Sequence, residues 1–347
     1  MRLLGIPTVI DRMVQQAINQ TLTPIYERQF SSRSFGFRPR RGCHDALRGA
    51  QKIIDAGYEY VVDLDLERFF DTVSHSKLIE ILSRTIKDGR VVSLIHKYLR
   101  SGVMNKGVFE MSEEGTPQGG PLSPLLSNIM LNELDKELEH RGLPFVRYAD
   151  DSMIFCKSER AAMRVKESIT RYIEGELYLK VNKEKTVVSY VSGVKYLGYS
   201  FYVSQGKCQL AVHPKAKAKM KAKLKELTSR SNGWGYAKRK QKLTEYIRGW
   251  VGYYHLANMK RLLMDTDSWL RRRIRMCIWK AWKLPKTRIK NLIRCGINKH
   301  DARRLGYVKG YWRVSSSIIM QRAASSQKLQ YAGYPTLMGS YLEWHPK

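Results

Sequence analysis

Apolar residues recur at two different spacings along the first part of the chain. A helical spacing of three and four positions runs from Ile10 to Tyr26 and again from Asp45 to Ala56. An alternating pattern follows from Tyr58 to Leu66 and predicts a strand with Asp63 and Asp65 on one face. The chain is therefore expected to open with helices and to continue into a sheet.

The next elements complete a β-α-β-β-α-β order. A Gly- and Pro-rich loop around Gly115 leads into a strongly amphipathic helix that stops near Gly142. The apolar runs Phe145–Tyr148 and Ser152–Cys156 predict a hairpin with Ala149-Asp150 at its tip. A helix near residues 159–174 and the strands TVVSYV and KYLGYSFYV follow. This order is that of a split βαβ sheet, so the fold class is α+β.

From about Pro214 the pattern becomes helical and basic. Three helices are expected, roughly at Lys215–Ser229, Lys238–His255 and Lys260–Trp282, before KLPKT interrupts the pattern. A smaller basic segment runs to the end. The expected domains are residues 1–57, 58–210, 211–284 and 285–347.

The charge distribution separates the two parts further. The 347 residues carry 62 Lys and Arg against 31 Asp and Glu, a net charge of +31. Residues 211–347 hold 32 of the basic residues and 6 of the acidic ones, whereas residues 1–210 hold 30 and 25. Such a polycation indicates a nucleic-acid partner, and a basic helix on a membrane surface is the alternative.

Ten aromatic residues are interleaved with these charges, in a combination that suits stacking on bases or ribose. Because aromatic residues at helical spacing are also ordinary core residues, we expect most of the ten in the core. They are Trp234, Tyr236, Trp250, Tyr253, Tyr254, Trp269, Trp279, Trp282, Tyr311 and Trp312.

Composition argues against several other classes. With 43% hydrophobic residues and no apolar run of about 18 to 20 residues, the chain is expected to be globular and cytoplasmic, without a membrane span or signal peptide. The cysteines form no CxxC pair, so neither a disulfide framework nor a zinc site is expected. They are Cys43, Cys156, Cys208, Cys277 and Cys295.

The segment SSRSFGFRPRRG predicts a basic loop between the first two helices. Its arginines lie beside Phe35 and Phe37, which suits phosphates or a template strand, and a solvated surface loop is an equal alternative. The arginines are Arg33, Arg38, Arg40 and Arg41.

Asp150 and Asp151 at the hairpin tip repel each other unless a cation lies beside them. An aspartate of the first strand, Asp63 or Asp65, can join them if the two strands are neighbours. Three such carboxylates suit two Mg²⁺ ions in nucleotidyl transfer, and a solvated Asp-Asp turn is the alternative.

Five motifs resemble, in order and spacing, the palm motifs of bacterial group II intron reverse transcriptases, also called maturases. The segment LTEYIRGWVGYYHLANM resembles the thumb, or maturase domain, of the same family. The resemblance covers essentially the whole chain and implies a right-hand polymerase palm with partial fingers, followed by an all-α thumb. The five motifs are DLDLERFFDTVSH, GTPQGGPLSPLLSNIMLNELD, YADD, LKVNKEKT and KYLGYSF.

This resemblance assigns roles to individual residues. The FFD register selects Asp65, rather than Asp63, as the metal-binding aspartate beside Asp150 and Asp151, and Leu66 offers a backbone carbonyl group. The implied cofactor is a pair of Mg²⁺ ions, with Mn²⁺ as a substitute.

Further residues are implied in substrate binding, among them Phe70, whose ring would exclude a ribose 2′-hydroxyl group. A loop that simply needs glycine is the alternative for Gly120, which with Gly119 would allow close approach of the nucleotide. The dNTP would be held by Arg2, Phe70, Gln118, Gly119 and Lys185. The primer end would be gripped by Tyr196, Leu197 and Gly198. Nucleic acid would be bound by Arg38, Arg40, Arg41, Arg271, Arg272 and Arg273.

The sequence departs from the family in two respects. The finger segment and the N-terminal extension that precede RxLGIP are missing ahead of Met1, so we expect a truncated front. The thumb is followed by no paired-cysteine HNH-type nuclease, as in endonuclease-lacking members.

The sequence therefore predicts an RNA-directed DNA polymerase that uses an RNA template, a DNA primer and dNTPs, and that binds its intron RNA to assist splicing. An RNA-binding splicing cofactor with weak or no polymerase activity is the alternative. A retron-type or diversity-generating reverse transcriptase is disfavoured by the long thumb. No membrane partner is expected, and the oligomeric state stays open.

Overall fold

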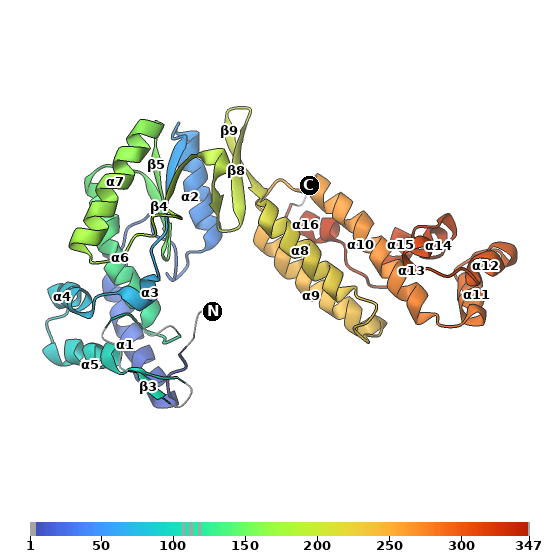
Figure 1. The fold of residues 1–347 in the computed structure, drawn as a ribbon, viewed down its shortest axis with the longest axis horizontal. Coiled ribbons are helices and arrows are strands. Elements are labelled where there is room, and N and C mark those ends of the chain that lie inside the picture. The colour runs from blue at the N-terminus through green and yellow to red at the C-terminus, as the bar shows by residue number, and fades with distance from the viewer. Residues whose placement is uncertain (1–4, 106–107, 111–113, 117–118, 346–347) are drawn as a thin grey trace. The chain divides into compact units, whose positions relative to one another are not determined.

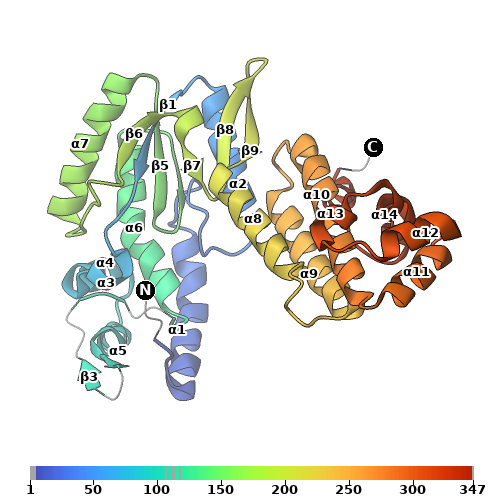
Figure 2. The same ribbon diagram turned by 45° about the vertical axis from the view of Figure 1, so that its right-hand side comes forward.

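The computed structural model describes residues 5–105, 108–110, 114–116 and 119–345. The chain divides into two compact units, which are described separately (Figures 1 and 2). Unit 1 comprises Met1–Leu197 and Phe201–Gln209, and unit 2 comprises Gly198–Ser200 and Leu210–Lys347. The finer domain limits expected from the sequence stay a prediction.

Unit 1 is built on a four-stranded antiparallel sheet with the strand order β4-β5-β1-β6. The central strands β1 and β5 pair from Tyr60 opposite Cys156 to Leu64 opposite Ser152. The split βαβ order is confirmed, although β1 is shorter at both ends than the predicted strand. The strands are β1 (Tyr60–Leu64), β4 (Phe145–Tyr148), β5 (Asp151–Cys156) and β6 (Val187–Tyr190).

The helices of unit 1 begin where capping side chains precede them. Thr8 caps α1 (Val9–Glu27) and Ser158 caps α7 (Glu159–Glu176), each by accepting a hydrogen bond from a backbone N–H of the first turn. The other elements are α2 (Cys43–Asp55), α3 (Phe69–Thr72), α4 (His75–Thr85), α5 (Gly89–Arg100), β2 (Val103–Asn105), β3 (Val108–Glu110) and α6 (Ser123–His140).

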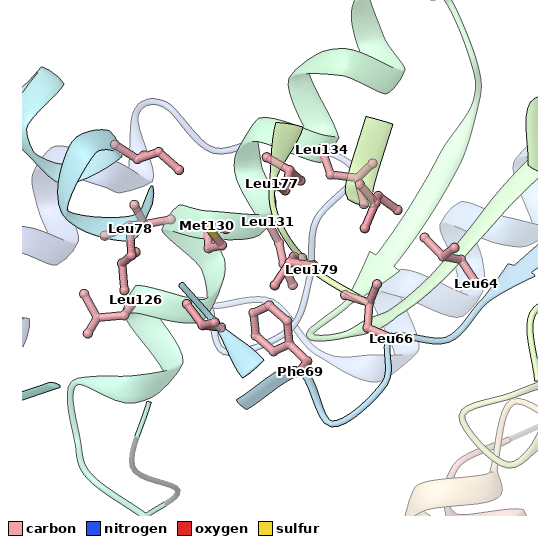
Figure 3. Packing of buried hydrophobic residues seen from close by; sticks show 14 of the residues in the cluster. Leu64, Leu66, Phe69, Leu78, Leu126, Met130, Leu131, Leu134, Leu177 and Leu179 are labelled. Carbon is pink, nitrogen blue, oxygen red and sulfur yellow. The ribbon is translucent and has the colours of Figure 1, made fainter. Parts of the chain in front are cut away.

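The main core of unit 1 joins the sheet to α6 and α7. Leu64, Leu66 and Phe69 enter it from β1 and the segment that follows, and meet the leucines of α6 (Figure 3). The helix α6 is confirmed, but the prediction that it is strongly amphipathic is wrong, because α6 also buries polar residues such as Asn128 and Asp135. These residues tolerate burial since they have hydrogen-bond partners inside the protein.

Alternate residues of β1 face away from this core. Val61 is buried on the other face, and Asp63 and Asp65 follow it at two-residue intervals. The two aspartates therefore lie on the face of the sheet that α6 and α7 leave uncovered, as the alternating pattern predicts.

Unit 2 is mainly helical, and its three long helices lie close to the predicted ranges. They are α8 (Pro214–Leu227), α9 (Tyr236–Tyr254) and α10 (Lys260–Ala281). Ahead of them the chain forms a three-stranded sheet of β7 (Lys195–Tyr196), β8 (Tyr199–Ser204) and β9 (Lys207–Val212). Shorter helices follow: α11 (Pro285–Arg294), α12 (Lys299–Gly306), α13 (Tyr311–Ser315), α14 (Ile318–Ala323), α15 (Ser326–Tyr331) and α16 (Leu337–Glu343).

The helix α16 returns to pack against α9 and α10. The carboxylate of Asp267 in α10 accepts hydrogen bonds from the backbone N–H groups of Leu337 and Met338, at 2.9 and 3.0 Å. The buried side chain of Tyr341 donates to the carbonyl oxygen of Ala257 at 3.2 Å. The basic segment after α10 is thus part of the same compact unit.

Two expectations from composition are met. The five cysteines are free thiols. None of the helices that the structure describes is both long enough and apolar enough to cross a membrane.

Candidate functional site

The two adjacent aspartates lie at the end of the β4–β5 hairpin. Tyr148 pairs with Asp151, so Ala149 and Asp150 form the tip, as predicted. Ala149 has a φ of 58°, in the left-handed region. This conformation reverses the chain within two residues and brings both carboxylates to one end of the sheet.

The first-strand aspartates lie at the same end because β1 and β5 are neighbours. Leu64 is opposite Ser152, so the next residue along each strand brings Asp65 beside Asp151. Asp63 lies two positions further into the sheet on the same face. The strand register thus places the backbone positions of these aspartates at the same end of the sheet.

The pKa of Asp63 reflects this crowding. Burial, together with the charges of Asp151 and Asp65, raises the pKa of Asp63 to about 6, and the charge of Lys195 acts in the opposite direction. The raised pKa shows that Asp63, Asp65 and Asp151 lie close enough to repel one another. The choice of Asp65 over Asp63 as the metal ligand stays a prediction from the resemblance.

Asp65 is fixed by the loop that precedes β6. Its carbonyl oxygen accepts from the N–H of Asn182 at 2.9 Å, and its own N–H donates to Oγ1 of Thr186 at 3.2 Å. Its carboxylate lies 3.4 Å from Nζ of Lys185, a side chain that is 70% exposed. The structure therefore places a predicted dNTP-binding residue beside a predicted metal ligand.

The donor set fits magnesium, since carboxylate oxygens are the ligands that Mg²⁺ prefers. Within the described residues, no three His, Cys, Asp or Glu side chains are gathered closely enough to hold a metal ion. Metal binding by Asp65, Asp150 and Asp151 stays a prediction, in which Lys185 would release the Asp65 carboxylate.

A buried tyrosine with an unsatisfied hydroxyl group lies near these carboxylates. Tyr196 is 2% exposed, and its Oη has no hydrogen-bond partner among the described residues. Burial and the charge of Asp151 raise its pKa well above the ordinary value. Leu197 and Gly198 follow with φ of 48° and 82°, so the predicted primer grip is a left-handed turn.

Leu66 and Phe70 lie at the start of the segment after β1. Leu66 is buried and forms an isolated bridge with Val181. Phe70 is half-buried, with its ring edge-on to that of Phe69 at a centroid distance of 5.3 Å. Packing therefore fixes the ring that the sequence assigned to sugar selection, while part of its surface stays exposed.

In the Gly-rich loop the structure describes both predicted glycines, while Arg2 and Gln118 lie outside the described residues. Gly119 has a φ of 112°, and a Cβ there would lie 2.3 Å from the carbonyl oxygen of Gly5. A Cβ at Gly120 would lie 2.5 Å from Oε1 of Gln15. Packing against the Gly5 backbone thus requires glycine at position 119. At Gly120 the close atom is the end of the Gln15 side chain, which can move, so the two interpretations of Gly120 stay open.

The arginines of the loop at residues 31–42 differ in their surroundings. Arg38 is buried, and its guanidinium group binds the Glu27 carboxylate and two carbonyl groups of the loop. This corrects the prediction that Arg38 binds nucleic acid, because its donors are used internally. Arg41 also donates to loop carbonyls and stacks on Phe35, whereas Arg40 is exposed and bonds to none of the described residues.

The arginine triplet of α10 is likewise bound within the protein. Arg271 is buried and donates to a carbonyl group ahead of α16. Arg272 lies 3.7 Å above the ring of Trp312. Arg273 donates to the carbonyl of Thr228 at the end of α8, where unpaired carbonyls attract cations. Each arginine of the triplet thus has a contact within unit 2, and its binding to nucleic acid stays a prediction.

The ten aromatic residues are not mainly core residues, so that expectation is wrong. Only Trp279 is buried; Tyr236 and Trp312 are exposed and the others lie between. Half of the rings are covered by cations instead of apolar side chains. The pairs are Lys238 over Trp234, Arg273 over Trp269, Arg288 over Trp279, Arg230 over Tyr311 and Arg272 over Trp312.

Sequence reasoning missed a buried polar network beneath the hairpin. Arg147 of β4 contacts Asn128 and Asp135 of α6, and all three side chains are buried. The available signal was the recurrence of Asn128, Asn132 and Asp135 at helical spacing within an apolar helix.

The sheet order and the carboxylates at its end are those of a polymerase palm, and comparison with known proteins agrees. The family described as reverse transcriptase (RNA-dependent DNA polymerase) matches residues 1–201, so the chain belongs to this family. The group II intron, maturase-specific domain matches residues 217–296 within unit 2. These matches confirm the predicted family and the α+β palm followed by a helical thumb.

Three curated relatives illustrate the similarity. Protein YkfC of Escherichia coli K12 is 35% identical over 238 residues, covering 57% of this chain and 62% of YkfC. The group II intron-encoded protein LtrA of Lactococcus lactis is 31% identical over 268 residues, covering 58% of this chain and 45% of LtrA. Nuclear intron maturase 2 of Arabidopsis thaliana is 31% identical over 192 residues, covering 44% and 26%. The chain thus spans less than two thirds of each relative.

Proposed function

We propose that this chain is an RNA-directed DNA polymerase that extends a DNA primer with dNTPs on an RNA template. The observation that carries the proposal is the convergence of Asp65 and Asp151 from two paired strands, with Asp150 at the adjoining tip. Family membership supports the same reaction.

Reverse transcriptases are metal-dependent nucleotidyltransferases, and we propose that Asp65, Asp150, Asp151 and the Leu66 carbonyl group hold two Mg²⁺ ions, with Mn²⁺ as a substitute. Such ions activate the primer 3′-hydroxyl group and stabilise the leaving pyrophosphate. In the same proposal Lys185 exchanges its ion pair with Asp65 for the triphosphate, which carries more negative charge.

The exposed part of the Phe70 ring suits a role in excluding the ribose 2′-hydroxyl group. Its packing against Phe69 limits its movement, as steric selection requires. The turn after Tyr196, with Leu197 and Gly198 in the left-handed region, suits the primer grip, and Gly119 suits a close approach of the protein backbone to the dNTP. Arg2 and Gln118 remain candidates by resemblance.

Unit 2 is proposed to bind intron RNA and to assist splicing. Its cations that have no internal partner among the described residues include Lys215, Lys217, Lys219 and Lys221 of α8. A groove of about 580 Å³ adjoins them, lined by α8 and by Tyr246, Trp250 and Tyr254 of α9. Free lysines beside partly exposed rings suit phosphates and bases. They join the α10 triplet as candidate RNA contacts, and Arg40 stays a candidate in unit 1.

A primer-extension assay tests the polymerase. With poly(rA)/oligo(dT), Mg²⁺ and dTTP, the chain is expected to extend the primer, and Asp150→Ala is expected to abolish extension with nearly unchanged RNA affinity, because it removes a metal ligand but no cation. Loss of both properties together would point to misfolding or to a different site.

The RNA-binding splicing cofactor is the second candidate function, and it is favoured by one observation. Residues 217–296 match the group II intron, maturase-specific domain. A chain that binds intron RNA tightly but extends no primer under Mg²⁺ or Mn²⁺ would establish this function in place of the first.

A further inference from the structure

The hairpin that carries Asp150 and Asp151 rests on a buried guanidinium group. The Arg147 side chain is 1% exposed, and its Nε and Nη2 donate to the two carboxylate oxygens of Asp135 at 2.7 and 2.5 Å. Asp135 is itself completely buried in α6. The bidentate pair therefore fixes the plane of the guanidinium group against a helix of the core.

The third nitrogen of Arg147 reaches the hairpin tip. Nη1 donates to the carbonyl oxygen of Ala149 and to Oδ1 of Asn128, each at 3.0 Å. Ala149 is the left-handed residue directly before Asp150. A non-glycine residue holds this conformation only where its surroundings impose it, and the bond to its carbonyl group is one such constraint.

The loop at residues 31–42 supplies a second constraint on the same residue. Asn128 donates from Nδ2 to the carbonyl oxygen of Gly36 at 2.9 Å. A Cβ at Gly36 would lie 2.2 Å from the backbone nitrogen of Ala149, so the loop backbone lies directly against the tip. The loop is held in turn by the bond from the Phe35 N–H to the Arg147 carbonyl oxygen at 2.8 Å.

A buried ion pair is weak evidence for stability, because well-packed apolar residues often replace it without loss. Apolar residues cannot replace the hydrogen bonds that Arg147 donates at the same time to a carboxylate group, a side-chain amide and the carbonyl group of the tip. This set of bonds needs the planar guanidinium group of arginine. We propose that Arg147, held by Asp135 and Asn128, is a positioning residue that fixes the Ala149 turn and thereby places Asp150 and Asp151 for metal binding. This inference rests on the proposed polymerase function.

The test compares three variants of the full chain. Arg147→Lys keeps the positive charge but removes the planar guanidinium group. Asn128→Ala removes one neutral hydrogen-bond partner of Arg147. The double variant, Arg147→Met with Asp135→Leu, removes both charges. Arg90→Met is the matched control, since Arg90 forms an exposed ion pair with Asp88 at the start of α5 in unit 1. The measurements are Mn²⁺ affinity without nucleic acid by titration calorimetry, kcat and KM for dTTP, and the melting temperature.

Misplaced ligands should weaken Mn²⁺ binding by about 10- to 100-fold and lower kcat by a similar factor in Arg147→Lys and in the double variant, with a smaller effect in Asn128→Ala. KM for dTTP should change by less than about threefold, because the residues that meet the nucleotide are untouched. The double variant should melt near the wild-type temperature, and Arg90→Met should match the wild type throughout.

Variants that melt earlier but bind Mn²⁺ with wild-type affinity would overturn the proposal and leave Arg147 a purely structural residue. If the double variant fails to fold, the Mn²⁺ affinities of Arg147→Lys and Asn128→Ala decide whether Arg147 positions the metal ligands. If the wild type extends no primer, the polymerase proposal fails, while weaker Mn²⁺ binding in the variants would still support the positioning role.

Discussion

Buried arginines are satisfied differently in the two units. In unit 1, Arg38 and Arg147 each bind a carboxylate, from Glu27 and Asp135. In unit 2, the arginines of α10 bind backbone carbonyl groups and a tryptophan ring instead. Carboxylates thus neutralise the two arginines of unit 1, whereas backbone dipoles and a π-face satisfy most of those in α10, where Asp267 lies near Arg271.

The cause is composition, and the consequence is electrostatic. Residues 211–347 have 6 acidic residues for 32 basic ones. One of the six, Asp267, accepts hydrogen bonds from the first backbone N–H groups of α16. Carbonyl groups and rings satisfy the donors of a cation without cancelling its charge. Unit 2 can therefore pack arginines inside and still keep a strongly positive field for nucleic acid.

The largest effect is expected when the ion pair between Arg147 and Asp135 in unit 1 is broken. Arg147→Met alone leaves the Asp135 carboxylate buried without a cation and should destabilise unit 1 by about 3–5 kcal/mol. Chemical denaturation monitored on unit 1 measures this loss. A loss under about 1 kcal/mol would mean that the carboxylate is not what satisfies Arg147.

The second prediction concerns the free cations of unit 2. Replacing Lys215, Lys217, Lys219 and Lys221 by Ala should keep the helix, lower RNA affinity by about 10- to 100-fold, and reduce the slope of log affinity against log salt by about one per lysine. Filter binding across a salt series measures both.

The matched control removes four exposed lysines of unit 1 with the same change in net charge: Lys52, Lys87, Lys157 and Lys183. It should leave affinity almost unchanged. An equal loss in the two variants would show that RNA responds to net charge and not to α8.

The third prediction concerns the crowded carboxylates of unit 1 and depends on pH. Because the folded state raises the pKa of Asp63 from an ordinary value of about 3.9 to about 6, stability is lost as pH rises through this window. Asp63→Asn removes this loss, so at pH 8 it should be more stable than the wild type by about 1–2 kcal/mol, after allowance for solvent screening.

Below about pH 4 the wild type and Asp63→Asn should unfold alike, since the carboxyl group is then neutral in both states. Urea denaturation at pH 3.5 and pH 8 provides the comparison. A constant difference between the two proteins at both pH values would rule out the electrostatic explanation.

The smallest effect is expected at the cation–π pair of unit 2. Arg272→Met should destabilise unit 2 by about 0.5–1 kcal/mol, because a thioether retains packing on Trp312 but loses the charge. RNA affinity should stay within about twofold, since Arg272 contacts protein. Thermal unfolding and filter binding measure the two quantities, and a tenfold loss of RNA affinity would establish Arg272 as an RNA contact.

Local patterns predicted much of unit 1. The alternation around YADD predicted the hairpin and its tip, because one side of each strand is buried and the register follows from that. The FFD register and the face shared by Asp63 and Asp65 indicated the carboxylate site. The geometry in which Lys185 contacts Asp65 depends on a loop more than a hundred residues away, and no local pattern encodes it.

The errors share one physical origin. From sequence alone, a polar residue in a helix is predicted to be exposed, and an arginine beside aromatic residues is predicted to contact nucleic acid. Both predictions fail when the side chain has partners within the protein that the sequence does not indicate. Asp135 and Arg38 found partners through tertiary packing, so burial overrode polarity in both. The helix α5 and the strand β9 were not predicted, although α5 is amphipathic with Asp88 as its N-cap and β9 alternates buried and less buried residues.

The return of α16 has a consequence for how the chain folds during synthesis. Tyr341 and Leu337 are buried against helices that precede them by many residues, so unit 2 stays incomplete until its last helix has left the ribosome. The residues of unit 1 are all synthesised by Gln209 and can fold earlier. During that interval the arginines and helix ends of the nascent thumb lack their final partners within the protein. Cellular RNA then competes with α16 and its neighbours for the cations that these helices later enclose.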